Sequence, residues 1–270
     1  MADMHTHSLF SFDGHAAIME MCEAAVSCGV DILAVTDHFD TDGITEGFYD
    51  PYDMTTARAA VKDAADRYRD QLTLIYGIEL GQPYTYPDVA DRLLQEARFD
   101  LVIGSLHNLI HVPDFFYINF HEMPLALCKR LWERSIEEIY TKLIRYPHID
   151  ILAHLTYPLR YMSQAGRHID LKEYTQQLTP LLQELIGRNI CLEVNTSGLR
   201  QGCGCTLPDM DVVRLYHSLG GRLISVGSDA HSPKDVGASI PEVYDSLHEI
   251  GFRYTYAGRQ SNGDLRMIPL

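Results

Sequence analysis

Polar side chains that can bind metals or move protons recur in this sequence at the ends of short apolar runs. These positions are held by His5, His7, Asp37, His38, Glu79, His107, His154, Glu193, Asn195, Asp229 and His231. Imidazole nitrogens and carboxylate oxygens bind borderline divalent metals such as Zn, Mn and Fe. Any one of these residues would be ordinary at the start of a loop, but their number favours a metal site.

Two short motifs place pairs of these side chains two residues apart. The motif His5-Thr6-His7 ends an apolar run that we expect to be a strand. Side chains two apart in a strand point to the same face, so both imidazoles can reach one ion. Asp229 and His231 repeat this spacing in the motif GSDAH, with a carboxylate in place of one imidazole.

Other motifs supply candidate ligands singly. Glu79 lies in GIEL, and its two carboxylate oxygens can bridge two ions. His107 in GSLH and His154 in LAHLTYP follow small residues, which leave room for a metal to approach. Asp37 and His38 are consecutive, so only one of them continues the inward direction of its strand. We expect His38 to be a ligand and Asp37 to be its neighbour or to orient it.

The size of this set distinguishes between kinds of metal site. A structural zinc ion is closed by four ligands, whereas a catalytic ion keeps one position open for water or substrate. The candidates outnumber what one structural ion needs, and they fit two or three ions. Clustered ions activate water and stabilise charge in phosphoryl and acyl hydrolysis. The set therefore predicts a hydrolase.

The elements that must position these residues can be read from the apolar pattern. Runs rich in Ile, Val and Leu predict strands at residues 4–7, 31–36, 72–78, 101–104, 149–153, 190–194 and 222–226. Helical periodicity predicts helices at residues 17–28, 55–70, 89–97, 124–145, 171–188, 210–219 and 240–250. This alternation is typical of β/α units around a parallel sheet. In a parallel barrel the strand ends open on one face, where the candidate ligands would converge.

We therefore predict an α/β fold, a distorted (β/α)7 TIM-like barrel in a single domain over residues 1–270. Residues 253–257 are a short candidate for an eighth strand, and we favour seven units. The net charge of −15 argues against a nucleic acid or an anionic membrane as partner. The sequence has neither a signal peptide pattern nor a membrane-length apolar run, which favours a cytoplasmic location.

Two segments have unusual compositions. Residues 107–123 are rich in aromatic side chains, and so long an irregular segment after a strand is typical of a lid or binding loop. The six cysteines follow neither a disulfide framework nor a zinc-ribbon spacing. Cys203 and Cys205 lie in GLRQGCGCTLP, where a thiolate metal site is conceivable, but C-x-C alone is weak and we favour an ordinary loop.

The ordered motifs resemble those of one enzyme superfamily. The series HTHSLFSFDG, TDH, GIELG, GSLH, AHLTYP, EVNTSGLR and GSDAHSPKDVG is similar to the PHP (polymerase and histidinol phosphatase) superfamily, above all its monofunctional histidinol-phosphate phosphatases. The likeness spans nearly the whole chain. It implies a phosphoric monoester hydrolase that converts L-histidinol phosphate to L-histidinol and phosphate in histidine biosynthesis.

The resemblance also implies a trinuclear metal centre. One ion would be held by His5, His7, Glu79 and Asp229, a second by Glu79, His107 and His154, and the third by Asp13, His38 and His231. This nitrogen and oxygen ligand set accepts Zn, Mn or Fe. Many relatives have a histidine at the position of Asp13, and His15 stands two residues further on; we favour Asp13.

Two arginines are candidates for binding the phosphate group. A phosphate monoester is a dianion, and planar guanidinium groups bind its oxygens bidentately. Arg160 follows His154 by six residues and Arg200 follows Asn195 by five, in loops on the face of the ligands. The resemblance favours phosphate binding by both over the alternative of two solvated loop arginines.

These parts predict a mechanism in which a hydroxide that bridges the ions linked by Glu79 attacks phosphorus in line. Asp229 and His231 are both candidates for the acid that protonates the leaving alkoxide and for the base that activates the water. Glu193, Asp114 and Tyr117 are candidates to contact the amine and the imidazole of the substrate. For each of them, a role in packing the core or the lid explains its presence equally well.

Three other functions share part of this pattern. Another PHP phosphoesterase, acting on a nucleotide or short oligonucleotide, would share the metal ligands but should have a basic groove, which the net charge disfavours. Metal-dependent amidohydrolases use a similar barrel with a carboxylated lysine at a strand end, where this sequence has Glu79. A metal-binding but inactive paralogue is disfavoured because the ligand set is complete.

Overall fold

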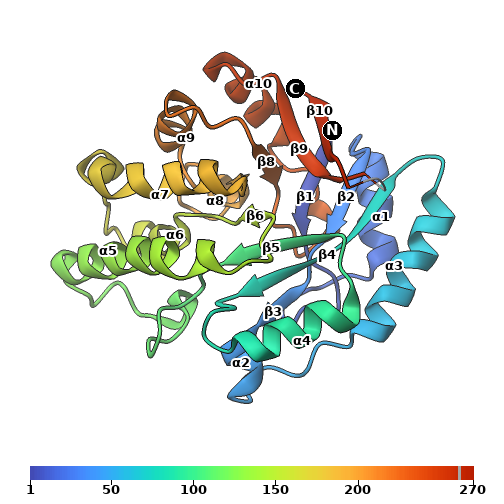
Figure 1. The fold of residues 1–270 in the computed structure, drawn as a ribbon, viewed down its shortest axis with the longest axis horizontal. Coiled ribbons are helices and arrows are strands. Elements are labelled where there is room, and N and C mark those ends of the chain that lie inside the picture. Colours follow the sequence, from blue (N-terminus) through green and yellow to red (C-terminus); the bar gives the residue numbers. More distant parts are fainter. Residues whose placement is uncertain (261–262) are drawn as a thin grey trace.

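A nearly closed barrel of parallel strands lies at the centre of the computed structural model, which describes residues 1–260 and 263–270 (Figure 1). Its strands, hydrogen-bonded in this order, are β1 (Ala2–Thr6), β2 (Ile32–Val35), β4 (Thr73–Gly81), β5 (Leu101–Ser105), β6 (Ile151–Leu152), β7 (Cys191–Asn195) and β8 (Ile224–Gly227). β8 returns to β1 through a parallel bridge between Thr6 and Ala230. The predicted seven-unit barrel is confirmed.

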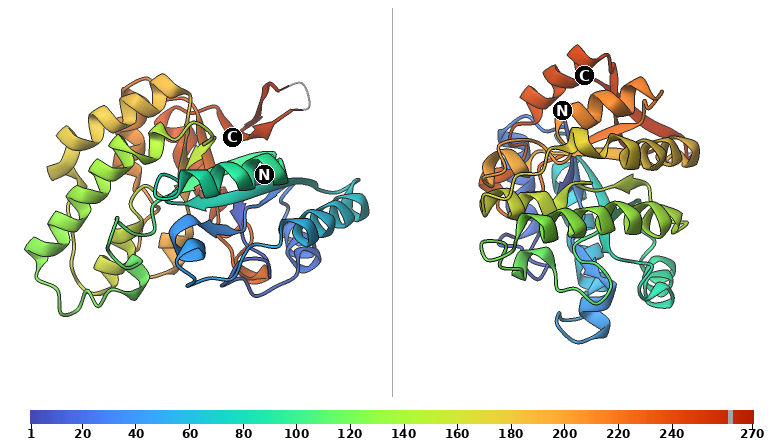
Figure 2. Two further views of the ribbon diagram at one scale, coloured as in Figure 1. Left: turned by 60° about the horizontal axis from the view of Figure 1, so that its bottom comes forward. Right: turned by 90° about the vertical axis from the view of Figure 1, so that its left-hand side faces the viewer.

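Helices surround the strands and follow them in the predicted alternation, as Figures 1 and 2 show. The main helices are α1 (Ile18–Ser27), α3 (Met54–Tyr68), α4 (Pro87–Ala97), α5 (Leu125–Thr141), α7 (Thr175–Arg188), α9 (Met210–Ser218) and α10 (Ile240–Ile250). A large apolar layer is buried between them and the outside of the barrel. In the described part of the chain, every helix is too short or too polar to span a membrane.

The predicted helix over residues 124–145 is divided, because α5 is followed by the 3-10 helix η2 (Leu143–Arg145). The predicted helix over residues 171–188 likewise begins as a 3-10 helix, η3 (Leu171–Tyr174), before α7. Short helices that the sequence did not indicate occupy the loops after the strands. These are α2 (Thr41–Thr45), α6 (Tyr157–Gln164), α8 (Ser197–Arg200), η1 (Phe115–Tyr117) and η4 (Pro233–Asp235).

An additional strand, β3 (His38–Asp40), pairs with the second half of β4 beyond the end of β2. The pairing is parallel, and its register sets His38 opposite Glu79 and Asp40 opposite Gly81. The long strand β4 thus has two partners on the same side, first β2 and then β3. This extension brings the residues of the TDHFD segment to the end of the barrel where the candidate ligands gather.

The candidate for an eighth strand is not part of the barrel. It forms β9 (Tyr254–Arg259), which pairs antiparallel with β10 (Leu265–Pro269) in a separate two-stranded sheet (Figure 2). Tyr256 and Ala257 of β9 pack into the barrel interior with side chains from the first halves of the strands, such as Met4 and Ile75. The hairpin therefore covers the end of the barrel opposite the candidate ligands.

Candidate metal centre

Glu79, on β4, lies among the predicted ligands and is fully buried. Its Oε2 atom is 3.0 Å from His38 Nδ1, and 3.1 Å from His5 Nε2 and 3.5 Å from His7 Nε2. β1 carries His5, and His7 follows its last residue, so the strand directs both imidazoles to the same carboxylate. The expected placement of the H-x-H motif on one face is therefore what the structure has.

The other oxygen of Glu79 faces two more histidines. Glu79 Oε1 is 2.8 Å from His154 Nε2 and 3.1 Å from His107 Nε2. Both histidines lie two residues beyond the ends of their strands, β6 and β5, and both are buried. One carboxylate thus has imidazoles against each of its oxygens, as expected of a group that bridges two ions.

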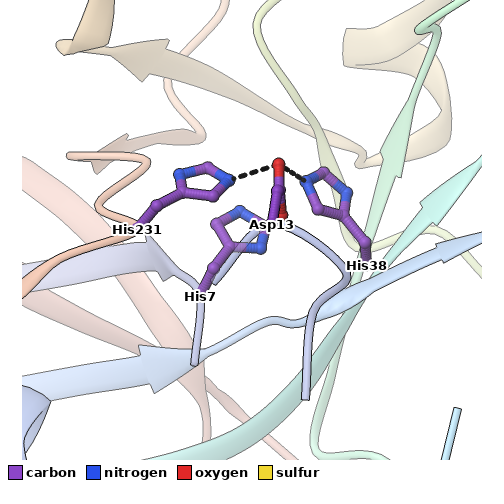
Figure 3. Close-up of side chains that lie close together, drawn as sticks. All are labelled: His7, Asp13, His38 and His231. Atoms are coloured by element: carbon purple, nitrogen blue, oxygen red, sulfur yellow. Dashed lines mark ion pairs between the residues drawn. The ribbon is translucent and has the colours of Figure 1, made fainter. Parts of the chain in front are cut away.

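Asp13 lies within a second set of imidazoles, which Figure 3 shows around its carboxylate. Asp13 Oδ2 is 3.1 Å from His231 Nε2 and 3.6 Å from His38 Nε2. The His7 ring stacks on both of these rings, with centroids 4.1 and 4.2 Å away. The alternative residue, His15, has an exposed side chain and lies outside this group. The geometry thus brings Asp13, rather than His15, to the other candidate ligands.

Asp229 connects the two sets. Its Oδ1 atom is 3.3 Å from His7 Nε2 and 3.8 Å from His5 Nε2. The residue has a left-handed φ of +55°, a conformation that costs free energy in a residue other than glycine and that clusters at functional sites. Asp3 holds the turn in place, because its carboxylate accepts a hydrogen bond from Ser228 N at 2.8 Å.

The residues present fit divalent metal ions. Among the described side chains, His5 Nε2, His7 Nε2 and Glu79 Oε2 are buried atoms without a hydrogen-bond partner. Ligands about 2.1 Å from one ion stand roughly 3.0 to 3.4 Å apart, and the N···O separations here run from 2.8 to 3.8 Å. Burial alone would raise the pKa of the Glu79 carboxyl, but the charges of His5, His38 and His107 hold this pKa well below its usual value. The carboxylate is thus kept in the ionised form that binds metals.

The cluster borders a cavity of about 640 Å³, a volume suited to a small organic substrate. The cavity walls beyond the candidate ligands include Phe12, Tyr49, Asp114, Phe116, Tyr117, Tyr157, Arg160, Tyr161, Gln164 and Gln201. Three of these residues, Asp114, Phe116 and Tyr117, belong to the aromatic segment over residues 107–123. That segment therefore lines the site, as expected of a binding loop.

The two candidate phosphate-binding arginines occupy different places. Arg160 lines the cavity, and its Nη2 donates to Ser197 Oγ at 2.6 Å and to Asp229 Oδ2 at 3.1 Å. Arg200 is not among the residues that line the cavity; its Nη2 donates to the Asp229 carbonyl at 2.8 Å, and its Nε is 3.6 Å from Asp235. The geometry therefore supports phosphate contact by Arg160 more directly than by Arg200.

Comparison with known proteins identifies the family. The PHP domain family matches residues 3–197, which include most of the candidate ligands. The chain belongs to this family. The sequence is 27% identical over 259 residues to the probable histidinol-phosphatase of Thermotoga maritima, covering 94% of each chain. It is 22% identical over 274 residues to the histidinol-phosphatase of Lactococcus lactis subsp. lactis, covering 98% of each.

Solved structures share the fold of this PHP domain. The crystal structure of histidinol phosphate phosphatase from Lactococcus lactis, complexed with zinc, L-histidinol and phosphate, superposes with a TM-score of 0.80 at 20% identity and covers 98% of both chains. The structure of the putative histidinol phosphatase from Listeria monocytogenes gives a TM-score of 0.69 at 20% identity and covers 90% of this chain. Because both sequence identities are 20%, these two similarities show a shared barrel fold.

Hydrogen bonds in this PHP domain fix the orientation of several candidate ligands through their second ring nitrogen. His5 Nδ1 is 2.7 Å from Glu193 Oε1, and His107 Nδ1 is 3.1 Å from Asp40 Oδ2. Such carboxylate partners fix the tautomer of a histidine and leave Nε2 free for a metal. Asp40 was not among the residues predicted from the sequence. Gly81, its partner on β4, leaves room for the Asp40 carboxylate, because a Cβ at Gly81 would lie 2.0 Å from Asp40 Oδ1.

Ser11 and Asp37 orient His7 in the same way. His7 Nδ1 is 3.0 Å from Ser11 Oγ, and the Ser11 hydroxyl donates to Asp37 Oδ1 at 3.1 Å. Ser11 was not selected from the sequence, and Asp37 was expected to orient or adjoin His38. Asp37 reaches His7 instead, because the turn of residues 8–11 folds back over the end of β1, where Ser8 N also donates to Asp37 Oδ1 at 2.6 Å.

The suggested contact of Glu193 with the amine of a substrate is not supported. Glu193 is 1% exposed on β7, and its carboxylate accepts hydrogen bonds from His154 N at 2.6 Å and Asn195 Nδ2 at 3.2 Å in addition to its contact with His5. The alternation of side chains along β7 directs Glu193 into the barrel, and Glu193 is not among the residues that line the cavity. Its position is that of a residue that orients ligands.

Replacing Glu193 by glutamine is expected to weaken metal binding by roughly 10- to 100-fold, the usual cost of losing the partner of a metal-bound histidine. An amide holds His5 less strongly than a carboxylate because it carries no charge. Titration of the metal-free protein against a competing chelator measures the affinity. The matched control is Glu138→Gln, a buried carboxylate on α5 that accepts from the Tyr84 hydroxyl at 3.0 Å. Equal affinities in the two variants would contradict the orienting role.

Proposed function

We propose that this PHP protein is a metal-dependent phosphomonoesterase that hydrolyses L-histidinol phosphate to L-histidinol and phosphate. The observation that carries the proposal is a buried set of metal-binding side chains at one cavity that also has an arginine in its wall. The names of the full-length relatives and of the Lactococcus lactis structure supply the substrate. The sequence match over nearly the whole chain supports a shared activity.

The residues proposed to hold two or three divalent ions are His5, His7, Asp13, His38, Glu79, His107, His154, Asp229 and His231. Bound ions would supply an acidified water as nucleophile and would offset the charge that develops on phosphorus. Glu79 would link two ion positions through its two oxygens. Zn, Mn and Fe all suit this donor set, and zinc is the metal in the Lactococcus lactis structure.

Arg160 is proposed to bind the phosphate oxygens. The charge of Asp229 holds the Arg160 guanidinium in place, and the Tyr157 ring lies 5.1 Å below it. A guanidinium fixed in this way meets the phosphate without losing much side-chain freedom.

Asp229 and His231 both border the cavity. Burial alone would raise the pKa of the Asp229 carboxyl, but its contacts with His7 and His5 hold this pKa well below its usual value, so Asp229 is ionised and suits the role of base. His231 is then the candidate to give a proton to the leaving alkoxide of histidinol.

Asp114 is proposed to contact the ammonium group of the substrate. Its carboxylate lines the cavity, accepts a hydrogen bond from Phe116 N at 2.8 Å, and has the Tyr157 hydroxyl 3.4 Å away. Phe116 and Tyr117 beside it are largely exposed aromatic rings that can cover a flat heterocycle. Burial raises the pKa of the Asp114 carboxyl to about 6, so the group is ionised at neutral pH.

Changing Asp114 to asparagine is expected to raise KM for L-histidinol phosphate by about tenfold or more, since a charged contact contributes roughly 1.5 to 3 kcal/mol. KM for a phosphate monoester without an amine, such as glycerol phosphate, should stay within about twofold. Steady-state kinetics with both substrates make the test. A parallel rise in both KM values would assign Asp114 to the structure of the loop instead of to the amine.

The proposed function is tested by a substrate panel on metal-reconstituted protein. L-Histidinol phosphate is compared with nucleotides, sugar phosphates and a phosphodiester, with and without a chelator in the assay. We expect histidinol phosphate to give by far the highest kcat/KM, and chelation to abolish its hydrolysis. Equal rates on all monoesters would overturn the substrate, and a preference for a nucleotide or oligonucleotide would favour another PHP phosphoesterase. No turnover of any ester would indicate an inactive metal-binding paralogue.

A further inference from the structure

The two cysteines of the GCGC segment lie next to each other, a few residues after Gln201 of the cavity wall. Cys203 Sγ is 3.5 Å from Cys205 Sγ, and both side chains are partly exposed. The segment follows Gln201, whose side chain lines the cavity and whose carbonyl accepts a hydrogen bond from Gln164 Nε2 at 2.5 Å. Nothing in the proposed phosphatase chemistry uses these thiols.

The backbone of this segment is suited to a small rearrangement. Gly204, between the cysteines, has a φ of +76°, and a Cβ added to it would meet no atom within 4 Å. Gly202, which precedes Cys203, has a φ of +79°. A disulfide needs the two sulfur atoms about 2 Å apart. Flexible glycines on both sides of Cys203 allow the sulfur atoms to approach from their present distance.

We infer that Cys203 and Cys205 form a redox-active dithiol, which low-molecular-weight disulfides convert to an intrachain disulfide that lowers turnover at the neighbouring cavity. The Cys203 thiolate attacks one sulfur of the reagent, forms a mixed disulfide and releases one small thiolate. Cys205 then attacks Cys203 Sγ, releases the second small thiol and passes its proton to it. Two protein thiols are oxidised, and one reagent disulfide is reduced to two thiols.

The surroundings of Cys203 favour its role as the attacking group. The hydrogen bond with Cys205 lowers the pKa of the Cys203 thiol to about 6, and the Ser163 hydroxyl and the Arg160 charge act in the same direction. A thiol with such a pKa is largely thiolate at neutral pH, and the thiolate is the reactive species. The same interaction raises the pKa of Cys205, which keeps the resolving thiol protonated until the second step.

The segment is connected to groups that border the reacting centre. Cys203 N and Gly204 N both donate to the Gly198 carbonyl, at 3.2 and 3.1 Å. Gly198 lies on α8 next to Ser197, whose hydroxyl binds both Arg160 and Asp229. Moving the two sulfur atoms together therefore alters the support of α8, and we expect turnover to fall severalfold in the oxidised protein.

The disulfide is tested on the full metal-loaded chain with hydroxyethyl disulfide as the reagent. We expect a mass loss of about 2 Da and a Cys203–Cys205 link in peptide mapping, because two protons leave with the two electrons. Cys203→Ser and Cys205→Ser should each lack this link, and Cys205→Ser should retain a mixed disulfide at Cys203. Cys28→Ser, which removes the other exposed cysteine, should behave like the unchanged protein. Absence of the link in the unchanged protein overturns the dithiol.

The effect on turnover is measured in the same samples and rests on the proposed function. Oxidised protein should hydrolyse L-histidinol phosphate severalfold more slowly than reduced protein. Reduction of the same sample with tris(carboxyethyl)phosphine should restore the rate. The double variant Cys203→Ser/Cys205→Ser should keep its rate in the presence of the reagent. Unchanged turnover despite a mapped disulfide would overturn the coupling to the cavity. If the protein hydrolyses no histidinol phosphate before oxidation but still forms the link when oxidised, the proposed substrate is refuted and the dithiol is not.

Discussion

Replacing Glu79 by glutamine is expected to lower kcat/KM for L-histidinol phosphate by about a thousandfold, which corresponds to roughly 4 kcal/mol of lost transition-state stabilisation. The two oxygens of Glu79 face five imidazoles within 3.5 Å. In the described structure, Glu79 is therefore the carboxylate whose two oxygens each face candidate ligands of a different ion. The amide has one acceptor oxygen and no charge, and it cannot bridge two cations. Steady-state kinetics and metal analysis of the purified variant measure the two consequences.

Metal content distinguishes a lost ligand from a misfolded protein. We expect the Glu79 variant to bind less metal per chain than the unchanged protein while keeping its helical circular dichroism. The matched control is Asp150→Asn, because Asp150 is a carboxylate just before β6, near the opposite end of the barrel, where it accepts from Val102 N at 3.0 Å. Full metal content together with near-normal kcat/KM in the Glu79 variant would refute the bridging role.

The strands and the residues that follow them could be predicted from the sequence, because both depend on local patterns. Apolar runs of strand length alternate with helical periodicity, and parallel topology then brings the strand ends together. His5, Glu79 and His154 were predicted in this way, and the structure places His5 Nε2 and His154 Nε2 3.1 and 2.8 Å from the Glu79 carboxylate. The family resemblance added Asp13, which follows no strand directly.

The residues that orient the ligands could not be predicted, because their contacts depend on how the chain returns in space. Asp40 reaches His107 only because β3 pairs with the end of β4, and a strand of three residues has too little pattern to be recognised. Ser11 lies in an irregular turn that folds over β1. Glu193 was noticed, but the sequence does not say how deep in the barrel its strand places it.

The different positions of Arg160 and Arg200 also could not be predicted from the sequence. Both follow a strand end by a few residues, and the number of residues does not fix the path of a loop. Helix α6 turns Arg160 into the cavity wall, where it is 5% exposed. Helix α8 turns Arg200 toward Asp235, behind the main chain of Asp229. The two side chains therefore lead to different expectations for the same substitution.

Replacing Arg160 by lysine is expected to lower kcat/KM for L-histidinol phosphate by roughly 30- to 150-fold, the effect of losing about 2 to 3 kcal/mol of charged hydrogen bonding. Lysine keeps a positive charge beside Asp229, so the carboxylate is not left unpaired, but it cannot bind two phosphate oxygens in one plane. Replacing Arg200 by lysine should lower kcat/KM by less than about tenfold, because the Arg200 side chain supports the turn at Asp229 from outside the cavity.

Inhibition by inorganic phosphate separates phosphate binding from a general disturbance of the site. The inhibition constant should rise in Arg160→Lys in parallel with the loss of kcat/KM, and it should change little in Arg200→Lys. Metal content should be normal in both variants, since neither arginine is placed as a ligand. Larger losses at Arg200 than at Arg160 would mean that the loop carrying α8 moves over the substrate, and the assignment of Arg160 as the main phosphate contact would then be wrong.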